Sequence, residues 1–272
     1  MDKNIGIIGY GSMGKMLLDK FSQAKVVDSQ ALFIANRTVS KIEEASDRYT
    51  ICKNNIELAG KADIIFICLR PSDIKPVLKE IVPYLKEDSL LVSLNGSVSF
   101  ANLEKISKKK YAKVIPSVTA EINQSQTLIS YNDLITEEDK NTLKVLLTTI
   151  GNVIELPENE LGMGSELVSC MPGFIASMFD VVCQSAKKHT SIPDNQIKDM
   201  VLNTMCATGQ LMLDNNMSFQ DVVSRVATKG GITEVGSQVI YDGFPKTADE
   251  MFEKTLEKRK QTAENATKAF NE

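Results

Sequence analysis

Histidine is almost missing from this sequence of 272 residues, in which His189 is the only one. The five cysteines are scattered and form no C-x-x-C pair, and there is no G-x-S-x-G motif. These absences argue against a metal centre, a histidine-based alcohol dehydrogenase and a serine hydrolase. The cysteines are expected to be reduced and mostly buried thiols of a cytoplasmic protein.

Long apolar runs and an excess of positive charge are also missing. No apolar stretch approaches the ~20 residues of a membrane span, and no cationic leader precedes the first expected strand. The net charge is -4 and the pI is near 5.3, which gives no electrostatic reason to expect a nucleic acid or an anionic membrane as partner. We therefore expect a cytoplasmic protein that binds a small molecule.

A glycine loop at Ile5 to Lys15 organises the first part of the chain. Its sequence I-G-I-I-G-Y-G-S-M-G-K predicts a strand, a tight turn and a helix. In a dinucleotide fingerprint the three glycines make the turn, admit a pyrophosphate and let helix and strand pack closely, and the diphosphate binds the N–H groups of the helix start. The expected cofactor-binding residues are Gly9, Gly11, Ser12, Met13 and Gly14.

The end of the next expected strand, Ala31 to Ala35, indicates the choice of cofactor. Enzymes that prefer NAD usually have an acidic residue there, whereas an arginine accommodates a 2′-phosphate. Here Asn36, Arg37 and Thr38 follow, and no carboxylate occurs before Glu43. This favours NADP(H), with NADH possible, and makes all three residues candidate cofactor ligands. The alternative is that Arg37 simply caps a surface turn.

Alternating strands and helices continue to residue 156. Continuous apolar runs, typical of parallel strands buried on both faces, are followed by glycine, proline or polar residues. Further strands are expected at Ile64 to Leu69, Leu90 to Leu94, Val114-Ile115, Thr127 to Ser130 and Asn152 to Leu156, with helices at Ile74 to Leu85 and Glu137 to Ile150. The pattern predicts an α/β fold, a Rossmann doubly wound sheet over residues 1–156 that binds its ligand at the carboxyl ends of the strands.

Residues 157–272 are expected to form an all-helical domain for substrate binding and dimerisation. Helices are predicted at Leu161 to Lys188, broken at Pro172-Gly173, and at Asp194 to Leu213, Phe219 to Ala227, Thr233 to Tyr241 and Thr247 to Phe270. The last is strongly charged and is expected at the surface. Because Phe174 to Val182 is apolar on more than one face, we expect a homodimer through this domain; the alternative is a thick monomeric core.

The chemistry that remains is hydride transfer, with the nicotinamide as the reactive group. β-Hydroxyacid dehydrogenases share this two-domain plan but use a lysine early in the helical domain, and this chain has none between Leu156 and Ala186. A protonated cyclic imine needs no such acid, because its reduction gives a neutral amine directly. The turn Lys229-Gly230-Gly231 before a helix could hold a carboxylate, and Thr233 could bond the imine nitrogen; the alternative is an ordinary pair of helix caps.

Five stretches resemble the pyrroline-5-carboxylate reductase family, the NAD(P)H enzymes that make proline. They are G-Y-G-S-M-G at Gly9 to Gly14, Asn36 to Thr38, Arg70-Pro71 where the family has Lys-Pro, Ser169 to Phe174 against S-G-S-G-P-A-Y/F, and Lys229 to Thr233 against S-P-G-G-x-T. The resemblance implies a Rossmann domain and an interlocked helical dimer, in some members assembled into pentamers of dimers.

The resemblance also implies which residues bind. It places cofactor at Asn55, Leu69, Arg70, Pro71 and Asn95. It places substrate at Ser169, Cys170, Lys229, Gly230, Gly231 and Thr233, the last being the catalytic candidate beside the imine nitrogen. The expected reaction is reduction of 1-pyrroline-5-carboxylate to L-proline.

Three loops depart from the family pattern. M-P-N-T-P is replaced by Ile115 to Thr119, Ser-Pro by Thr228-Lys229, and A-A-G by Leu94 to Gly96. These forms look more like the divergent late-competence (ComER-like) branch of Gram-positive bacteria. Two alternatives therefore stay open: reduction of a different imine or oxo acid, and a catalytically inactive NADP-binding regulatory protein.

Overall fold

The computed structural model describes residues 2–38, 40–43 and 48–271. Two compact units divide the chain: Met1–Pro172 together with Leu256–Glu272, and Gly173–Thr255. Because this division follows contacts, it puts the last turns of the chain with the first unit; the domain boundary predicted at residue 156 stays a prediction.

One eight-stranded sheet forms the frame of the first unit, in the order β3-β2-β1-β4-β5-β6-β7-β8. The strands are β1 Ile5–Ile8, β2 Leu32–Ala35, β3 Thr50–Ile51, β4 Ile64–Ile67, β5 Leu90–Ser93, β6 Lys110–Ile115, β7 Ser125–Tyr131 and β8 Gly151–Glu155. All seven predicted strands are present, and only the two-residue β3 was missed. The α/β Rossmann fold is confirmed.

Six strands, β1 to β6, are mutually parallel, so their carboxyl ends meet at one rim. β7 runs antiparallel to β6, and β8 runs parallel to β7. The connection from β6 to β7 is too short for the crossover that a parallel pair needs, which accounts for the reversal. The predicted concentration of glycine and polar residues lies at the rim of the parallel part.

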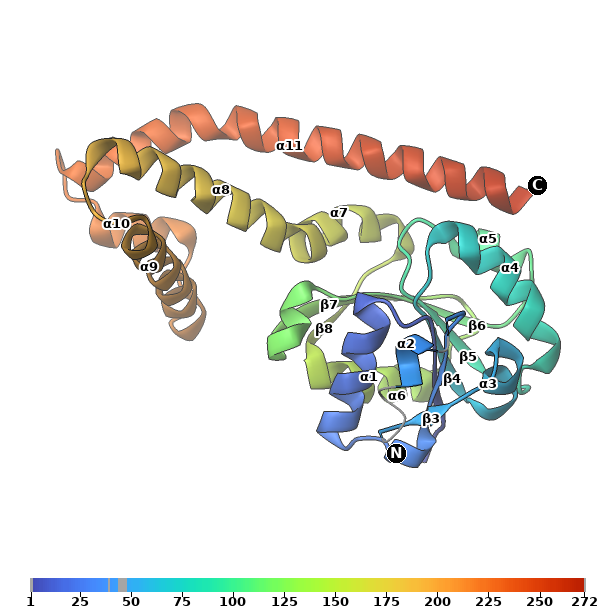
Figure 1. Cartoon of the computed structure of the whole chain (residues 1–272). Helices are drawn as coiled ribbons and strands as arrows, with labels where there is room; N and C mark the ends of the chain where they lie inside the picture. Colours follow the sequence, from blue (N-terminus) through green and yellow to red (C-terminus); the bar gives the residue numbers. More distant parts are fainter. Residues whose placement is uncertain (1, 39, 44–47, 272) are drawn as a thin grey trace. The chain divides into compact units, whose positions relative to one another are not determined.

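Helices cover both faces of the sheet (Figure 1). α1 (Ser12–Ala24), α2 (Ser40–Glu43) and α6 (Glu137–Leu147) pack on one face. α3 (Asn55–Lys61), α4 (Pro71–Ile81) and α5 (Phe100–Glu104) pack on the other. The β1, β2, β4 and β5 residues are all buried, as expected for strands covered on both sides.

The second half of the chain is helical, as predicted, but its breaks differ. Its helices are α7 Leu161–Ser165, α8 Met171–Ala186, α9 Asp194–Asp214, α10 Phe219–Val226 and α11 Ile232–Asn271. The two last predicted helices form one, since α11 runs through Pro245. The proline deprives the Tyr241 carbonyl of its helical partner, but this stretch is exposed and water can take that bond.

Pro172 does not break its helix either. A π-helical turn, Glu166–Cys170, joins α7 to α8 and makes Glu158–His189 one continuous helix. In a regular α-helix the ring of Pro172 would clash with the carbonyl four residues earlier, and that carbonyl lies in the wider π turn, which makes room for the ring. By length and composition alone this helix could cross a membrane, contrary to the expectation that no stretch would approach that length.

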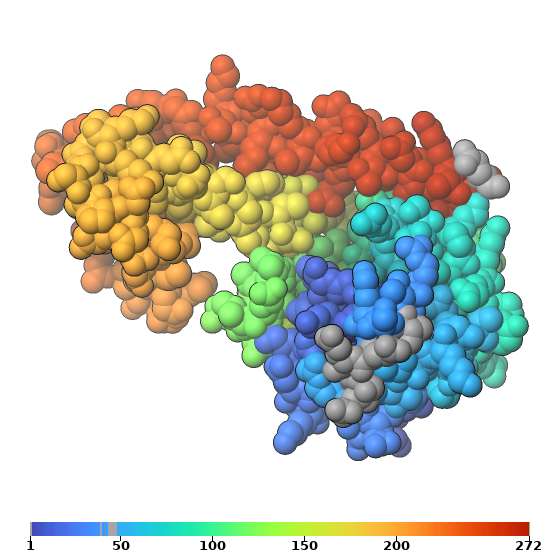
Figure 2. All heavy atoms as spheres, in the orientation of Figure 1, coloured from blue at the N-terminus to red at the C-terminus, as the bar shows by residue number. Residues whose placement is uncertain are grey.

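The end of α11 returns to the first unit and packs on the α4–α5 face of the sheet. Ala266 and Phe270 are buried there, and the Asn102 amide donates to the Thr267 hydroxyl at 3.0 Å. The red C-terminal turns lie against the cyan segment in Figure 2. All five cysteines are free, as predicted, but Cys52 alone among them is buried.

Candidate functional site

The glycine loop after β1 has the geometry that a dinucleotide requires. Gly9 has a φ of +100°, and a Cβ there would lie 2.6 Å from the Cys68 carbonyl oxygen. A Cβ on Gly14 would lie 2.0 Å from the Gly9 carbonyl oxygen, whereas one on Gly11 would meet nothing within 4 Å. Gly9 and Gly14 thus serve the turn and the close packing, and Gly11 leaves open space where a pyrophosphate can approach.

The start of α1 is suited to an anion. Gly11 is its N-cap and provides no side-chain cap, and no acidic residue occupies the first turn. The N–H groups of Ser12 and Met13 therefore have no partner among the described residues and carry the positive end of the helix dipole. These features fit the phosphates of a dinucleotide.

Asn36 and Arg37 have different tasks at the end of β2. Asn36 Oδ1 accepts the Tyr10 N–H at 3.1 Å, and its Nδ2 donates to the Thr38 carbonyl at 2.8 Å, so this side chain joins the strand end to the glycine loop. Arg37 and Thr38 are exposed, and Arg37 makes no hydrogen bond or ion pair with any residue that the structure describes. Its guanidinium is free to bind a 2′-phosphate.

Further along the rim, the predicted cofactor residues begin α4 and follow β5. Leu69 is half-buried, Arg70 is the exposed N-cap of α4, and Pro71 is its first residue. Asn95 Oδ1 accepts the N–H groups of Ser97 and Val98, at 2.9 and 3.2 Å, which shapes the loop after β5. All of these lie at the carboxyl ends of parallel strands.

Asn55 is engaged elsewhere in this structure. It is the first residue of α3, and its Nδ2 donates to Glu80 Oε2 at 3.0 Å. Glu80 lies near the end of α4 opposite to Arg70-Pro71. The structure therefore brings the other predicted cofactor residues to one rim and holds the Asn55 side chain away from Arg70; its role stays a prediction.

The predicted substrate turn forms before α11. Gly230 has a φ of +71°, and the Gly231 N–H donates to the Thr228 carbonyl at 2.7 Å. The Gly230 N–H donates to Glu234 Oε2 at 2.6 Å, so a carboxylate of the chain itself binds this turn. Beside it, Lys229 is exposed and Thr233 is half-buried. Ser169 and Cys170 belong to the other compact unit, in its π turn.

Sequence reasoning missed two half-buried ion pairs of the first unit. Lys113 on β6 donates to Glu158 Oε1 at 3.0 Å and to the Gly96 carbonyl at 3.2 Å, and burial lowers its pKa while Glu158 opposes that shift. The position of Lys113 inside an apolar strand run could have indicated a buried, paired cation. Arg259 bonds Glu166, and the charged sequence around it indicated only a surface position.

Cys170 lies beside the second of these pairs. Arg259 Nη2 approaches its Sγ at 3.8 Å. Burial raises the pKa of the Cys170 thiol, and the negative charge of Glu166 adds to that shift. The thiol is therefore kept neutral, and Cys170 can contribute a weak hydrogen bond or a packing surface to a ligand.

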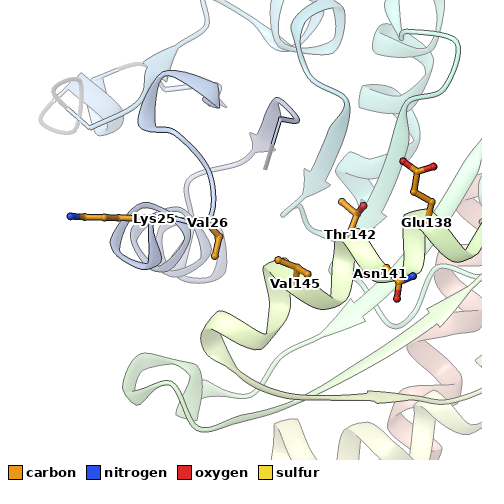
Figure 3. A pocket seen from close by; sticks show the side chains of 6 residues that line it. All are labelled: Lys25, Val26, Glu138, Asn141, Thr142 and Val145. Atoms are coloured by element: carbon orange, nitrogen blue, oxygen red, sulfur yellow. The ribbon is translucent and has the colours of Figure 1, made fainter.

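A separate surface hollow of about 780 Å³ lies between the end of α1 and α6. Figure 3 shows Val26 and Val145 across this hollow, with the Lys25 side chain directed away from α6. Since α1 begins at the glycine loop and the hollow is at its other end, no cofactor residue predicted from the sequence is among its described lining residues.

Two family matches cover the two halves of the chain. Residues 4–96 match the family described as NADP oxidoreductase coenzyme F420-dependent, and residues 158–262 match pyrroline-5-carboxylate reductase dimerisation. A Bacillus subtilis (strain 168) protein named pyrroline-5-carboxylate reductase 3 is 32% identical over 94% of this chain and 95% of its own length. The chain belongs to the pyrroline-5-carboxylate reductase family. It is therefore an NAD(P)H-dependent oxidoreductase that acts on a C=N bond.

Other relatives refine its place in the pyrroline-5-carboxylate reductase family. ComE operon protein 4 of Bacillus subtilis (strain 168) is 27% identical over 98% of this chain and 99% of its own length, which puts the chain near that branch. Plasmodium falciparum pyrroline carboxylate reductase, solved with NADP bound, has a TM-score of 0.83 and 22% identity over 96% of this chain and 98% of its own. The predicted fold, family and nicotinamide cofactor are confirmed.

Proposed function

We propose that this chain reduces 1-pyrroline-5-carboxylate to L-proline with hydride from NADPH. The observation that carries the proposal is the free Arg37 guanidinium beside an open glycine loop, in a chain 32% identical to a relative named for this reaction. Hydride adds to the imine carbon, and the protonated nitrogen becomes a neutral amine without a separate acid. This chemistry suits a chain whose one histidine, His189, lies at a helix end.

The substrate contacts in the proposal come from the turn before α11. The Gly230 N–H and the Lys229 ammonium bind the carboxylate, and the Thr233 hydroxyl bonds the nitrogen. Gly231 shapes the turn, since its N–H donates to the Thr228 carbonyl. Glu234 supports this assignment because its carboxylate already binds the Gly230 N–H, at 2.6 Å. A substrate carboxylate would displace it. Ser169 and Cys170, which belong to the other compact unit, stay predicted substrate residues.

We infer that the working form is a cytoplasmic homodimer, open to higher assembly. Within residues 173–255, all of which the structure describes, Ile197 is the only buried residue. A helical unit with so little core needs another surface, and residues 158–262 match a dimerisation domain. We propose that a second copy of this chain, and not lipid, covers the apolar helix Glu158–His189. We propose no nucleic-acid partner.

A second candidate is an NADP-binding regulatory protein without turnover. It is favoured by the similarity to ComE operon protein 4 and by Ser117, which replaces the asparagine of the M-P-N-T-P motif in the family resemblance. Ser117 is buried, and its Oγ accepts the Thr119 N–H at 3.4 Å within its own loop. This side chain is thus committed to the loop. Reduction of a different imine or oxo acid is the other alternative.

The test is NADPH oxidation, followed by absorbance, when pyrroline-5-carboxylate is added to the purified protein. Thr233→Ala should lower kcat/KM about tenfold or more, because it removes one hydrogen bond to a charged group, and Thr233→Ser should restore most of it. Thr247→Ala, on an exposed turn of the same helix, is the matched control. NADH and a six-membered cyclic imine serve as parallel substrates.

Three results would redirect the proposal. Turnover only with the six-membered imine would indicate a different substrate. NADPH binding without oxidation by any imine would favour the regulatory protein. Full activity of Thr233→Ala would show that the Thr233 hydroxyl does not bind the substrate nitrogen.

A further inference from the structure

Two half-buried ion pairs lie near one glycine of the rim. Lys113, whose side chain is 3% exposed, donates to the Gly96 carbonyl at 3.2 Å and to Glu158 at 3.0 Å. A methyl group built on Gly96 would lie 3.7 Å from Arg259 Nη1, and Arg259 is paired with Glu166. Lys113 bonds the Gly96 carbonyl directly, and Arg259 Nη1 faces the space beside the Gly96 Cα, where a side chain would begin. The ion pairs are therefore oriented, with their positive ends toward the loop after β5.

Arg259 and Glu166 do not form the usual bidentate ion pair, in which two nitrogens bind two carboxylate oxygens. Its Nε and Nη2 donate to the same oxygen, Glu166 Oε1, at 2.9 and 2.7 Å, and Nη2 also donates to Ser165 Oγ at 3.1 Å. Glu166 Oε2 is buried without a partner, whereas a two-oxygen fork would have satisfied it. Nη1 has no acceptor among the described residues. Glu166 thus fixes one edge of the guanidinium and leaves the other edge facing the loop that contains Gly96.

Gly96 lies in the half of the site that holds the nicotinamide. In a doubly wound sheet the dinucleotide spans the point where the strand order reverses, with one mononucleotide on each half. The glycine loop after β1 and Arg37 after β2 bind the phosphates and the adenosine side. β5 lies beyond β4 on the other half, so the loop that contains Asn95 and Gly96 is at the nicotinamide end.

The nicotinamide ring differs in charge between its two redox states. It is neutral in NADPH and carries one positive charge in NADP⁺, after two electrons and a proton have left as hydride. A fixed cation beside it raises the free energy of the oxidised form alone. We propose that Arg259, oriented by Glu166, makes this site discriminate against oxidised cofactor and so favours its release after reduction.

The proposal concerns cofactor binding only, so it can be tested whether or not pyrroline-5-carboxylate is the substrate. The measured quantity is the ratio of the Kd of NADP⁺ to that of NADPH. NADPH is titrated by its own fluorescence, since the chain has no tryptophan, and NADP⁺ by displacement of NADPH. Both are equilibrium measurements on the full-length protein.

The informative variant replaces both members of the pair, Arg259→Gln with Glu166→Gln. It keeps the net charge and leaves no buried carboxylate unpaired, so it avoids the penalty of a single substitution. We expect the Kd ratio to fall roughly three- to tenfold, mainly because NADP⁺ binds more tightly. Arg259→Lys, which retains the positive charge, should keep most of the discrimination and covers the case in which the double variant fails to fold.

A merely structural role for Arg259 gives a different result. Lys105 also holds the end of α11, by donating to Asn271 Oδ1 at 2.8 Å, but it is not among the groups near Gly96. Lys105→Met is therefore the matched control and should leave the ratio unchanged. If the double variant keeps the wild-type ratio, or if Lys105→Met lowers it equally, Arg259 is a tether and the proposal is wrong. An Arg259→Lys protein without discrimination would overturn it as well.

Discussion

Arg37 stands at the end of β2 with an exposed guanidinium, and among the described residues nothing pairs with it. Arg37→Asp should weaken NADPH binding about 10- to 100-fold, because it replaces a charge-assisted contact with repulsion of the 2′-phosphate. NADH lacks that phosphate and should lose far less affinity. The measurement is the Kd of each cofactor by nicotinamide fluorescence.

The control for Arg37→Asp makes the same change of charge in the helical unit. Arg225 is exposed on α10, so Arg225→Asp alters the net charge equally without touching the rim. Unchanged NADPH affinity in Arg37→Asp would show that the residue only caps the turn. An equal loss in Arg225→Asp would show that the effect is one of overall charge.

At the scale of one element, two glycines of the β1–α1 junction have different roles: Gly14 allows close packing, and Gly11 leaves space for the cofactor. Gly14→Ala should destabilise the fold by about 2 kcal/mol or more, since its Cβ would lie 2.0 Å from the Gly9 carbonyl oxygen and backbone would have to move. Gly11→Ala has open space and should leave the melting temperature of the cofactor-free protein within a few degrees. Its NADPH affinity should nevertheless fall, because the methyl group takes the space of the pyrophosphate.

Thermal unfolding with and without NADPH distinguishes the two variants. Gly11→Ala should lose most of the stabilisation that NADPH gives to the wild type, and Gly14→Ala should melt early under both conditions. Equal melting of the two cofactor-free variants would contradict the packing role of Gly14. A full ligand-induced shift in Gly11→Ala would contradict the pyrophosphate role of Gly11.

At the scale of the whole molecule, the helical unit is short of a core. Val181 on α8 is 64% exposed in the single chain. If a second copy covers α8, Val181→Asp should raise the dimer dissociation constant about tenfold or more, because it buries an unpaired carboxylate. Val145 on α6 is 50% exposed in the other unit, and Val145→Asp should leave association unchanged. Sedimentation over a range of concentrations measures both, and a Val181→Asp protein as dimeric as wild type would exclude α8 from the interface.

The sequence alone determined the features that depend on neighbouring residues. The glycine loop, the buried strands and the turn at Gly230 are local, since a positive φ or a run of apolar residues follows from consecutive side chains. The rim residues followed as well, because parallel strands end on the same side of a sheet. Only β3 was too short to leave a pattern.

The tertiary structure decided what joins distant parts of the chain. Glu166 meets Arg259, and Glu158 meets Lys113, only after the sheet and the helices have packed. The reversal at β7, the commitment of Asn55 to Glu80 and the return of the end of α11 likewise depend on packing. Pairing of charges across such separations leaves no periodic signal in a sequence. Lys113 inside an apolar strand run marks a buried cation, but the sequence does not show which carboxylate pairs with it.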